Sequence, residues 1–277
     1  MIYADLLPDL VDLAAAAGEA ILEVYDSDFA VETKADESPL TQADLASHRV
    51  IVAGLTKLTP DIPILSEEAD PPAYAVRQGW DRYWLIDPLD GTKEFVSRNG
   101  EFTVNIALIV GHSAELGVVG LPTRSLVYTG DTVAGLAQCF DLSTPDAAPR
   151  KLGGRSWQDA GGLVIVASRS HGGERLERYV SALESRFGAV ARTPVGSSLK
   201  LCILAEGRAD IYPRLGPTSE WDIAAAHAVL SAAGGDVWAI DGNPLLYNAE
   251  DNLLNPEFIA VADRSFAWRD ALPQVPD

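Results

Sequence analysis

Apolar residues recur at helical spacing along the first part of the chain. Over residues 4–25 an apolar stripe is formed by Leu6, Leu10, Leu13, Ala17, Ile21 and Val24. This spacing predicts an amphipathic helix whose stripe faces the core. A second helix is predicted over residues 41–58, where Thr41 has the position of an N-cap and Asp44 follows three residues later. Taken alone, Asp44 is therefore a helix-capping residue.

Short apolar runs separated by glycine and proline predict strands. The predicted strands cover residues 62–65, 83–86, 103–110, 115–119, 125–129 and 136–140. Those from residue 103 onward are expected to form an antiparallel sheet. The stretch 141–156 is rich in Asp, Ser, Pro, Ala and Gly, which is typical of a domain boundary. We therefore expect an N-terminal part over residues 1–145 and a C-terminal part over residues 157–277.

Beyond this boundary, strands and helices alternate. The predicted strands cover residues 163–167, 189–193, 209–213 and 237–240, the last of these being the final strand. The predicted helices cover residues 174–187, 197–205 and 223–233. This alternation predicts an α/β arrangement for the second half of the chain.

The chain of 277 residues is strongly acidic, with 40 Asp and Glu against 21 Lys and Arg and a net charge of −19. This charge argues against nucleic acid polymers and anionic membranes as broad-surface partners. It does not exclude a small anionic substrate, because bound metal ions can invert the local field.

Cys139 and Cys202 are the two cysteines, too few for a disulfide framework, so we expect a reducing compartment. We also expect no signal peptide and no integral membrane segment. The predicted location is the cytoplasm. Peripheral attachment to the inner face of the cell membrane remains an alternative for which the charge gives no electrostatic reason.

The richest chemistry lies at residues 87–92, Asp-Pro-Leu-Asp-Gly-Thr, directly after the apolar run 83–86. We expect the strand to stop at Pro88, which lacks the N–H that a sheet requires. Gly91 permits close approach of the backbone to a ligand, and Thr92 adds a hydroxyl. Carboxylates, a carbonyl and a hydroxyl at one point suit a hard cation such as Mg²⁺. The alternative is an ordinary turn, since Asp-Pro and Asp-Gly both favour turns.

Two other places carry carboxylates beside a predicted element. Glu67 and Glu68 follow the strand predicted over residues 62–65, and the alternative for both is a solvated acidic loop. Asp222 stands where the helix over residues 223–233 begins, so capping is the alternative for this carboxylate.

Three stretches contain groups suited to phosphate, namely 168–171, 196–200 and 212–214. Ser197 and Ser198 stand at the start of a predicted helix, which is a natural anion site. Individually each stretch is a weak signal, because Arg and Lys are usually solvated.

Together, residues 66–68, 84–92 and 221–226 resemble, in this order, the motifs of the inositol monophosphatase-like superfamily of metal-dependent phosphatases. The resemblance runs over nearly the whole chain. Within the superfamily, the continuation Lys93-Glu94-Phe95, the stretch 98–105 and the phosphate-compatible stretches are most similar to bacterial 3′(2′),5′-bisphosphate nucleotidases of the CysQ type.

The resemblance implies a site for two or three Mg²⁺ ions. Its implied metal ligands are Glu67, Asp87, the carbonyl of Leu89, Asp90 and Asp222, with Asp87 bridging two ions. Glu68 remains an alternative to Glu67. The implied catalytic pair is Thr92 with Asp44, which would activate the attacking water.

The implied reaction is hydrolysis of 3′-phosphoadenosine 5′-phosphate to AMP and phosphate, linked to sulfur assimilation and inhibited by Li⁺. A second implied substrate is 3′-phosphoadenylyl sulfate. The implied substrate-binding residues are Glu67, Leu89, Asp90, Gly91, Thr92, His171, Ser197, Lys200, Arg214 and Asp222.

For the fold, the resemblance implies a layered α/β/α/β/α sandwich of the inositol monophosphatase and fructose-1,6-bisphosphatase type, with the active site at the junction of the two parts. Two other functions are weighed. One is a phosphatase of inositol phosphates or other sugar phosphates. The other is a non-catalytic sensor of adenosine phosphates or metals. Both residues of the implied catalytic pair, Asp44 and Thr92, are present, and a protein without catalytic activity is expected to have lost at least one of the catalytic residues. No oligomeric state is predicted.

Overall fold

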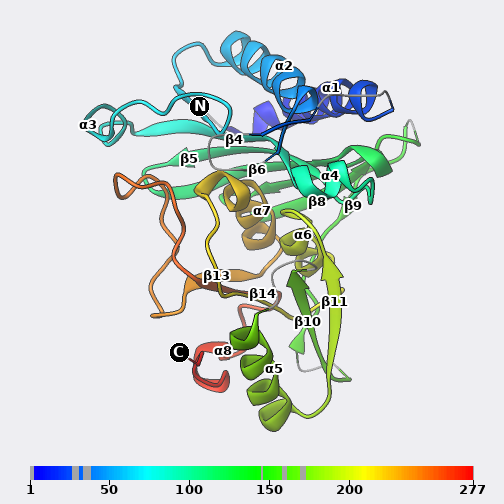
Figure 1. The fold of residues 1–277 in the computed structure, drawn as a ribbon, viewed down its shortest axis with the longest axis vertical. Helices are drawn as coiled ribbons and strands as arrows, with labels where there is room; N and C mark the ends of the chain where they lie inside the picture. Colours follow the sequence, from blue (N-terminus) through cyan, green and yellow to red (C-terminus); the bar gives the residue numbers. More distant parts are fainter. Residues whose placement is uncertain are drawn as a thin grey trace.

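Helices and sheets alternate in layers through the molecule. The structure is a computed structural model that describes residues 3–26, 31–33, 39–144, 146–157, 161–168 and 173–276. Within these ranges the order from one end to the other is helices, sheet, helices, sheet, helices (Figure 1). This is the α/β/α/β/α sandwich that the family resemblance implies.

The larger sheet has seven strands among the described residues, in chain order from β3 to β9. Its strands are β3 (Ile64–Ser66), β4 (Arg82–Asp90), β5 (Thr103–Val110), β6 (Ser113–Leu121), β7 (Leu126–Asp131), β8 (Leu136–Asp141) and β9 (Arg150–Lys151). β3 runs parallel to β4, and all later neighbours are antiparallel.

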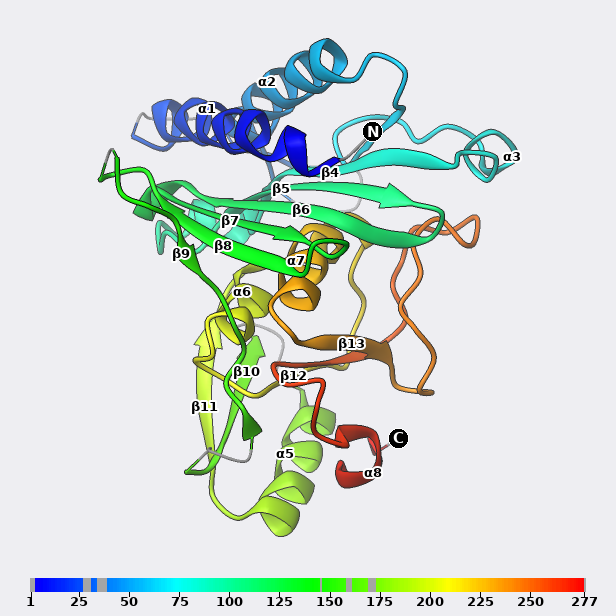
Figure 2. The same ribbon diagram turned by 180° about the vertical axis from the view of Figure 1, so that it is seen from behind.

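Helices cover both faces of this sheet (Figure 2). The helices α1 (Leu7–Tyr25) and α2 (Gln42–Leu58) pack on one face, and α7 (Glu220–Ala232) packs on the other. Alternate residues of β4 consequently enter different cores: Trp84 and Ile86 pack with α1 and α2, whereas Tyr83 and Leu85 pack with α7. Burial on both faces explains why β4 is a continuous apolar run.

The predicted end of the strand at Pro88 is wrong, because β4 continues to Asp90. Asp87 is paired with Asn105 and Asp90 with Thr103, so the register shifts between them. This bulge removes Pro88 from the hydrogen-bond ladder, which is how a sheet accommodates proline.

The smaller sheet has five strands among the described residues, in the order β11-β10-β12-β14-β13. Its strands are β10 (Leu163–Ser168), β11 (Val190–Val195), β12 (Ile211–Arg214), β13 (Asp236–Ala239) and β14 (Phe258–Val261). α6 (Leu199–Ala205) and α7 lie between the two sheets, and α5 (Glu174–Phe187) and α8 (Trp268–Ala271) lie beyond the smaller sheet (Figure 1).

The prediction of residues 237–240 as the final strand is wrong, because β14 follows β13 and lies between β13 and β12. All four residues of β14 are buried, so this strand lacks the alternation of polar and apolar residues that marks a half-buried strand.

The remaining elements are short. They are the 3-10 helices η1 (Tyr3–Leu6) and η2 (Pro122–Arg124), the helices α3 (Tyr74–Arg77) and α4 (Thr92–Val96), and the paired strands β1 (Val31–Thr33) and β2 (Pro39–Thr41). The cap expected from the side chain of Thr41 lies outside what the structure describes. Among the described residues, no helix combines the length and the hydropathy needed to cross a membrane.

α7 lies unusually close to the larger sheet. A Cβ at Gly117 of β6 would stand 2.0 Å from the carbonyl oxygen of Ala225, and a Cβ at Gly130 of β7 would stand 2.5 Å from the Cα of Val229. Only glycine leaves room for such an approach. The sheet therefore fixes the position of α7 through backbone contact.

We expect Gly117→Ala to lower the free energy of unfolding by about 1–3 kcal/mol, because the added methyl group must displace α7. Urea unfolding measures this change. Gly153→Ala is the control, since a Cβ at Gly153 would meet no atom within 4 Å in the described structure. Equal stability of the two variants would contradict the close packing of α7.

Candidate active site

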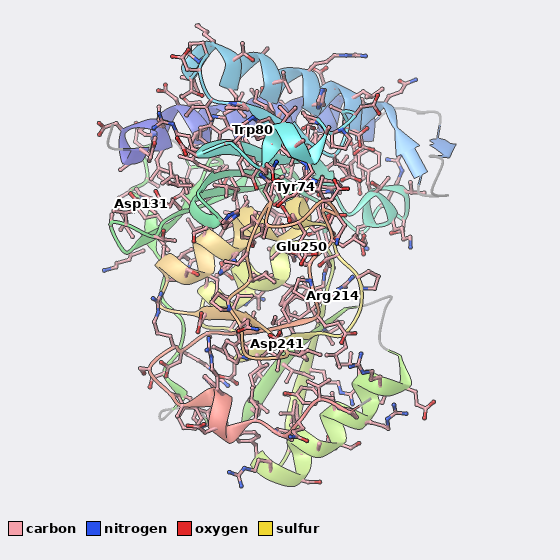
Figure 3. All side chains as sticks on the ribbon, turned by 90° about the vertical axis from the view of Figure 1, so that its left-hand side faces the viewer. Tyr74, Trp80, Asp131, Arg214, Asp241 and Glu250 are labelled. Carbon is pink, nitrogen blue, oxygen red and sulfur yellow. The ribbon has the colours of Figure 1, made fainter. Side chains whose placement is uncertain are left out.

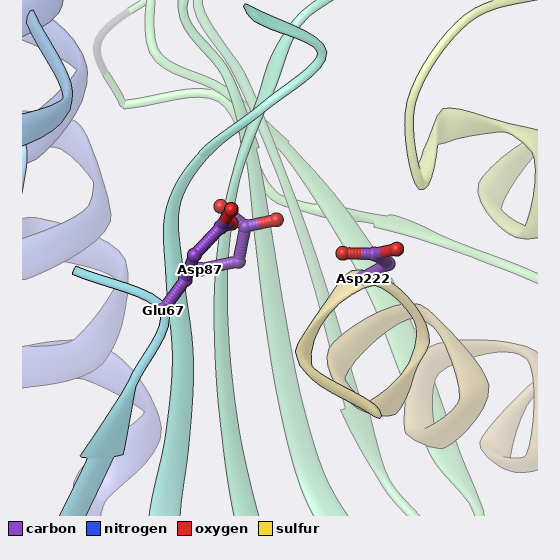
Figure 4. A group of neighbouring side chains, drawn as sticks. All are labelled: Glu67, Asp87 and Asp222. Carbon is purple, nitrogen blue, oxygen red and sulfur yellow. The ribbon is translucent and has the colours of Figure 1, made fainter. Parts of the chain in front are cut away.

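Three carboxylates from different elements converge at one edge of the larger sheet. They are Glu67, which follows β3, Asp87 in β4 and Asp222 in α7. Each offers an oxygen, and these oxygens lie within 4.8 Å of one another (Figure 4). β3 and β4 are parallel, so their carboxyl ends meet, and the N–H of Glu67 donates to the carbonyl oxygen of Ile86 at 3.2 Å.

The bulge of β4 is fixed from two sides. Oδ1 of Asp87 accepts a hydrogen bond from the N–H of Leu89 at 3.1 Å. Oγ of Ser47, on α2, donates to the carbonyl oxygen of Pro88 at 2.7 Å. Both bonds are buried, so the backbone around Leu89 is held rigidly next to Asp87. Sequence reasoning did not single out Ser47, since a serine inside a helix carries no specific signal.

Asp222 has two roles in the structure. α7 begins at Glu220, earlier than the predicted residue 223, and Ser219 is its N-cap. Oδ2 of Asp222 accepts a hydrogen bond from the N–H of Ser219 at 2.9 Å, which completes a capping box. The capping interpretation is therefore correct, and the same carboxylate also faces Glu67 and Asp87.

Asp90 is tied to the turn before α6. Its Oδ2 accepts a hydrogen bond from the N–H of Ser198. Oγ of Ser198 lies 2.8 Å from Oγ1 of Thr103 and donates to Oδ1 of Asn105 at 2.7 Å. Sequence analysis did not identify this network as part of the site. The feature of the sequence that could have revealed this network is the presence of two polar residues, Thr103 and Asn105, in an otherwise apolar strand.

A pocket joins this acidic edge to the cations of the second half of the chain. The residues that line it include Asp90, Glu94, Ser197, Ser198, Lys200, Tyr212, Arg214, Thr218 and Asp222. Nζ of Lys200 donates to the carbonyl oxygen of Ser197 at 2.7 Å and lies 5.7 Å from the centre of the Tyr212 ring. Nε of Arg214 donates to the carbonyl oxygen of Gly216 at 3.2 Å. Each of the two cations thus donates to a backbone carbonyl.

The other predicted site residues are placed as follows. Asp44 is 2% exposed on α2. Gly91 has a φ of 93°, a conformation that favours glycine, and Thr92 is the half-buried first residue of α4. His171 lies outside the described residues.

The carboxylates of this site destabilise one another when they are ionised. The pKa of Asp87 is raised well above its usual range, first by burial and then by Glu67, Asp90, Asp222 and Asp44. Desolvation and neighbouring carboxylates raise the pKa of Asp222 to about 8. For Asp90, desolvation outweighs the attraction of Lys200 and the N–H of Ser198 and raises the pKa to about 6. A cation among these oxygens would relieve the repulsion.

The donor set fits a hard divalent cation. Each group that converges here offers oxygen, and the thiol and imidazole ligands that softer ions prefer are not among the described members of the cluster.

The raised pKa of Asp222 predicts how stability depends on pH without metal. A carboxyl with a higher pKa in the folded than in the unfolded protein binds its proton more tightly when folded, so stability falls as pH rises toward the folded pKa. In EDTA, between about pH 6.5 and about pH 8, we expect Asp222 to lower stability by at most about 1.4 kcal/mol per pH unit. Mg²⁺ should restore it.

Thermal melting with and without Mg²⁺ measures this effect. Asp222→Asn should reduce the slope, and the slope that remains comes from Asp87 and Glu220, since burial raises the pKa of Asp87 and raises that of Glu220 to about 7. His227, whose pKa burial lowers to about 4, lies neutral throughout this range. A melting temperature that does not change with pH in EDTA would contradict the repulsion.

Comparison with known proteins agrees with this geometry. A model of the inositol monophosphatase family matches residues 4–266. The chain is 48% identical over 259 residues to the 3′(2′),5′-bisphosphate nucleotidase CysQ of Escherichia coli (strain K12), which covers 91% of this chain and 98% of that protein. The protein of the same name from Buchnera aphidicola is 37% identical over 268 residues, covering 94% and 95%.

Solved structures show the same relationship. The crystal structure of CysQ from Bacteroides thetaiotaomicron, a bacterial member of the inositol monophosphatase family, matches with a TM-score of 0.80 and 41% identity over 92% of this chain and 96% of that one. An inositol monophosphatase from Zymomonas mobilis shares the fold, with a TM-score of 0.73 and 22% identity over 96% of each chain. The chain belongs to the inositol monophosphatase family.

Proposed function

We propose that this protein is a Mg²⁺-dependent 3′(2′),5′-bisphosphate nucleotidase that hydrolyses 3′-phosphoadenosine 5′-phosphate to AMP and phosphate in sulfur assimilation. The inositol monophosphatase family is metal-dependent, and the acidic cluster at the edge of the larger sheet fits that requirement. The observation that carries the proposal is the pocket that places Lys200 and Arg214 next to Asp90 and Asp222. The relative from Escherichia coli that is 48% identical is named as a 3′(2′),5′-bisphosphate nucleotidase, which supports a nucleotide bisphosphate as the substrate.

The proposed metal ligands are oxygens from three places in the fold. The β4 bulge contributes Asp87, the carbonyl of Leu89 and Asp90, the turn after β3 contributes Glu67, and the first turn of α7 contributes Asp222. Two or three Mg²⁺ ions bound there would neutralise charge on the transferring phosphoryl group and polarise the attacking water. The anionic substrate therefore needs the metal-loaded site, since the chain itself has a net charge of −19.

The proposed catalytic pair is Asp44 and Thr92. A threonine hydroxyl is a weak base, so a buried carboxylate such as Asp44 is needed to accept its proton. Ser47 lies one turn after Asp44 on α2 and binds the carbonyl oxygen of Pro88, which fixes α2 against the β4 bulge. The N–H groups at the start of α4, from Thr92, have no acceptor within the helix, so they are suited to a phosphate oxygen.

The proposed nucleotide contacts lie on the opposite wall of the pocket. Lys200 lines the pocket and is 7% exposed, and its ammonium donates to the Ser197 carbonyl oxygen, so its charge has a fixed support. Together with Arg214, it is suited to the phosphate that the substrate retains. Gly91, Ser197 and, outside the described residues, His171 complete the proposed substrate set.

The proposed location is the cytoplasm. Cys139 and Cys202 are both buried free thiols, which is typical of a reducing compartment.

We expect Mg²⁺-dependent phosphate release from 3′-phosphoadenosine 5′-phosphate to exceed that from inositol 1-phosphate, because Lys200 and Arg214 recognise a second phosphate. Li⁺ should inhibit the reaction, and Asp90→Asn should reduce kcat by at least about a hundredfold, by removal of a metal ligand. A phosphate assay on both substrates measures this. A preference for inositol 1-phosphate would overturn the proposed substrate. Release of phosphate from neither substrate would favour the alternative function, a non-catalytic sensor of adenosine phosphates or metals.

Lys200→Met should raise KM for 3′-phosphoadenosine 5′-phosphate about tenfold, the effect of losing one charged hydrogen bond. KM for inositol 1-phosphate should change little, because that substrate has no second phosphate. The control is Lys57→Met, which removes an exposed lysine in the last turn of α2. An equal effect of Lys200→Met on both substrates would show that Lys200 does not bind the retained phosphate.

A further inference from the structure

A buried polar cluster joins three elements from distant parts of the chain. Arg77 belongs to α3, Glu220 is the first residue of α7, and Asn248 lies in the loop between β13 and β14. Their exposed fractions are 2%, 3% and 2%, so each places a polar or charged group away from water. These three described residues are not among those that line the pocket with Asp90 and Lys200.

Asn248 is the centre of this Arg77–Asn248–Glu220 cluster. Its backbone N–H donates to both carboxylate oxygens of Glu220, at 2.9 and 2.8 Å. Its Nδ2 donates to the carbonyl oxygen of Arg77 at 2.7 Å, and its Oδ1 accepts a hydrogen bond from Nη1 of Arg77. The φ of Asn248 is 53°, a conformation that asparagine adopts more readily than most residues. One residue therefore connects α3 to the first turn of α7.

Further contacts strengthen the junction between α3 and the loop. The guanidinium of Arg77 also donates to the carbonyl oxygens of Glu250, at 3.1 Å, and of Asp251. The hydroxyl of Tyr74 donates to the carbonyl oxygen of Ala249 at 2.7 Å. Figure 3 labels Tyr74 and Glu250 at this junction. The loop is thus attached to α3 by side chains that reach its backbone.

The same loop holds the start of α7. The N–H of Glu220 donates to the carbonyl oxygen of Leu253 at 2.8 Å, and Nδ2 of Asn255 donates to the carbonyl oxygen of Ser219 at 2.7 Å. Asp222 lies in this first turn, and its position follows from that of the turn. Because Asp222 faces other carboxylates, repulsion between these groups when they are ionised would favour displacement of the turn away from β4. The loop opposes that displacement.

The chemistry of the cluster also favours a role in fixing geometry. Removing a guanidinium and a carboxylate from water is costly, and apolar side chains of similar size often stabilise a protein junction as well or better. Hydrogen bonds, in contrast, specify direction and distance, which well-packed apolar side chains specify less strictly.

We propose that Arg77, Asn248 and Glu220 are positioning residues for the metal site, and that they hold the first turn of α7 so that Asp222 stays opposite Glu67 and Asp87. The inference rests on the proposed function in one respect, the role of Asp222 as a metal ligand. It does not depend on the substrate.

The test is Mg²⁺ binding by isothermal titration calorimetry on the full chain. Glu220→Ala leaves the N–H of Asn248 without its carboxylate acceptor, and Asn248→Gly removes the bonds to Arg77 while tolerating the positive φ. Both should weaken Mg²⁺ binding about tenfold or more, the usual effect of losing a group that orients a metal ligand. Glu220→Gln retains an acceptor and should bind within about threefold of the wild-type protein.

Thr59→Val is the matched control. It removes a buried hydroxyl that accepts a hydrogen bond from Nε1 of Trp84 at 2.8 Å, just beyond the last residue of α2, so it should lower the melting temperature but leave Mg²⁺ binding unchanged. The proposal is overturned if Glu220→Ala and Asn248→Gly lower only the melting temperature, as Thr59→Val does. If Asn248→Gly does not fold, the Glu220→Ala and Glu220→Gln pair decides. Because calorimetry needs no substrate, a wrong substrate in the proposed function leaves this comparison intact.

Discussion

Carboxylates that are held close together and away from water repel one another, and the packing around the site has to withstand this repulsion. Asp87 is 1% exposed and lies within reach of Glu67 and Asp222. Burial and the neighbouring charges both raise its pKa, so the ionised cluster stores unfavourable energy until a cation enters it. Such a cluster persists only where rigid elements oppose its expansion.

The layers provide that rigidity. α7 approaches the larger sheet so closely that Gly117 has no room for a Cβ, and the β4 bulge is bonded to α2 through Ser47. The loop between β13 and β14 then fixes the first turn of α7 through Asn248. Asp87 and Asp222 are therefore attached to elements that are packed closely against their neighbours, and their freedom to move apart is small.

The charges of the site are also divided between the two sheets. Elements that pack on the larger sheet contribute the carboxylates, whereas α6 and β12 contribute Lys200 and Arg214. The proposed substrate with two phosphates would suit this division, because one phosphate could meet the acidic edge while the other meets the cations. The bond from the N–H of Ser198 to Asp90 links the two walls directly, so the carboxylates and the cations share a support.

The local elements and the chemistry at their ends can be predicted from the amino-acid sequence. The apolar stripe of α1, the continuous run of β4 and the carboxylates Asp87 and Asp90 are local patterns, and the motif resemblance placed Glu67 and Asp222 in the same site. Three features became visible in the folded chain alone: β4 continues past Pro88, β14 lies between β12 and β13, and Asn248 joins Arg77 to Glu220. These features depend on packing between residues far apart in the chain, and such packing leaves no periodicity or spacing in the sequence around either partner.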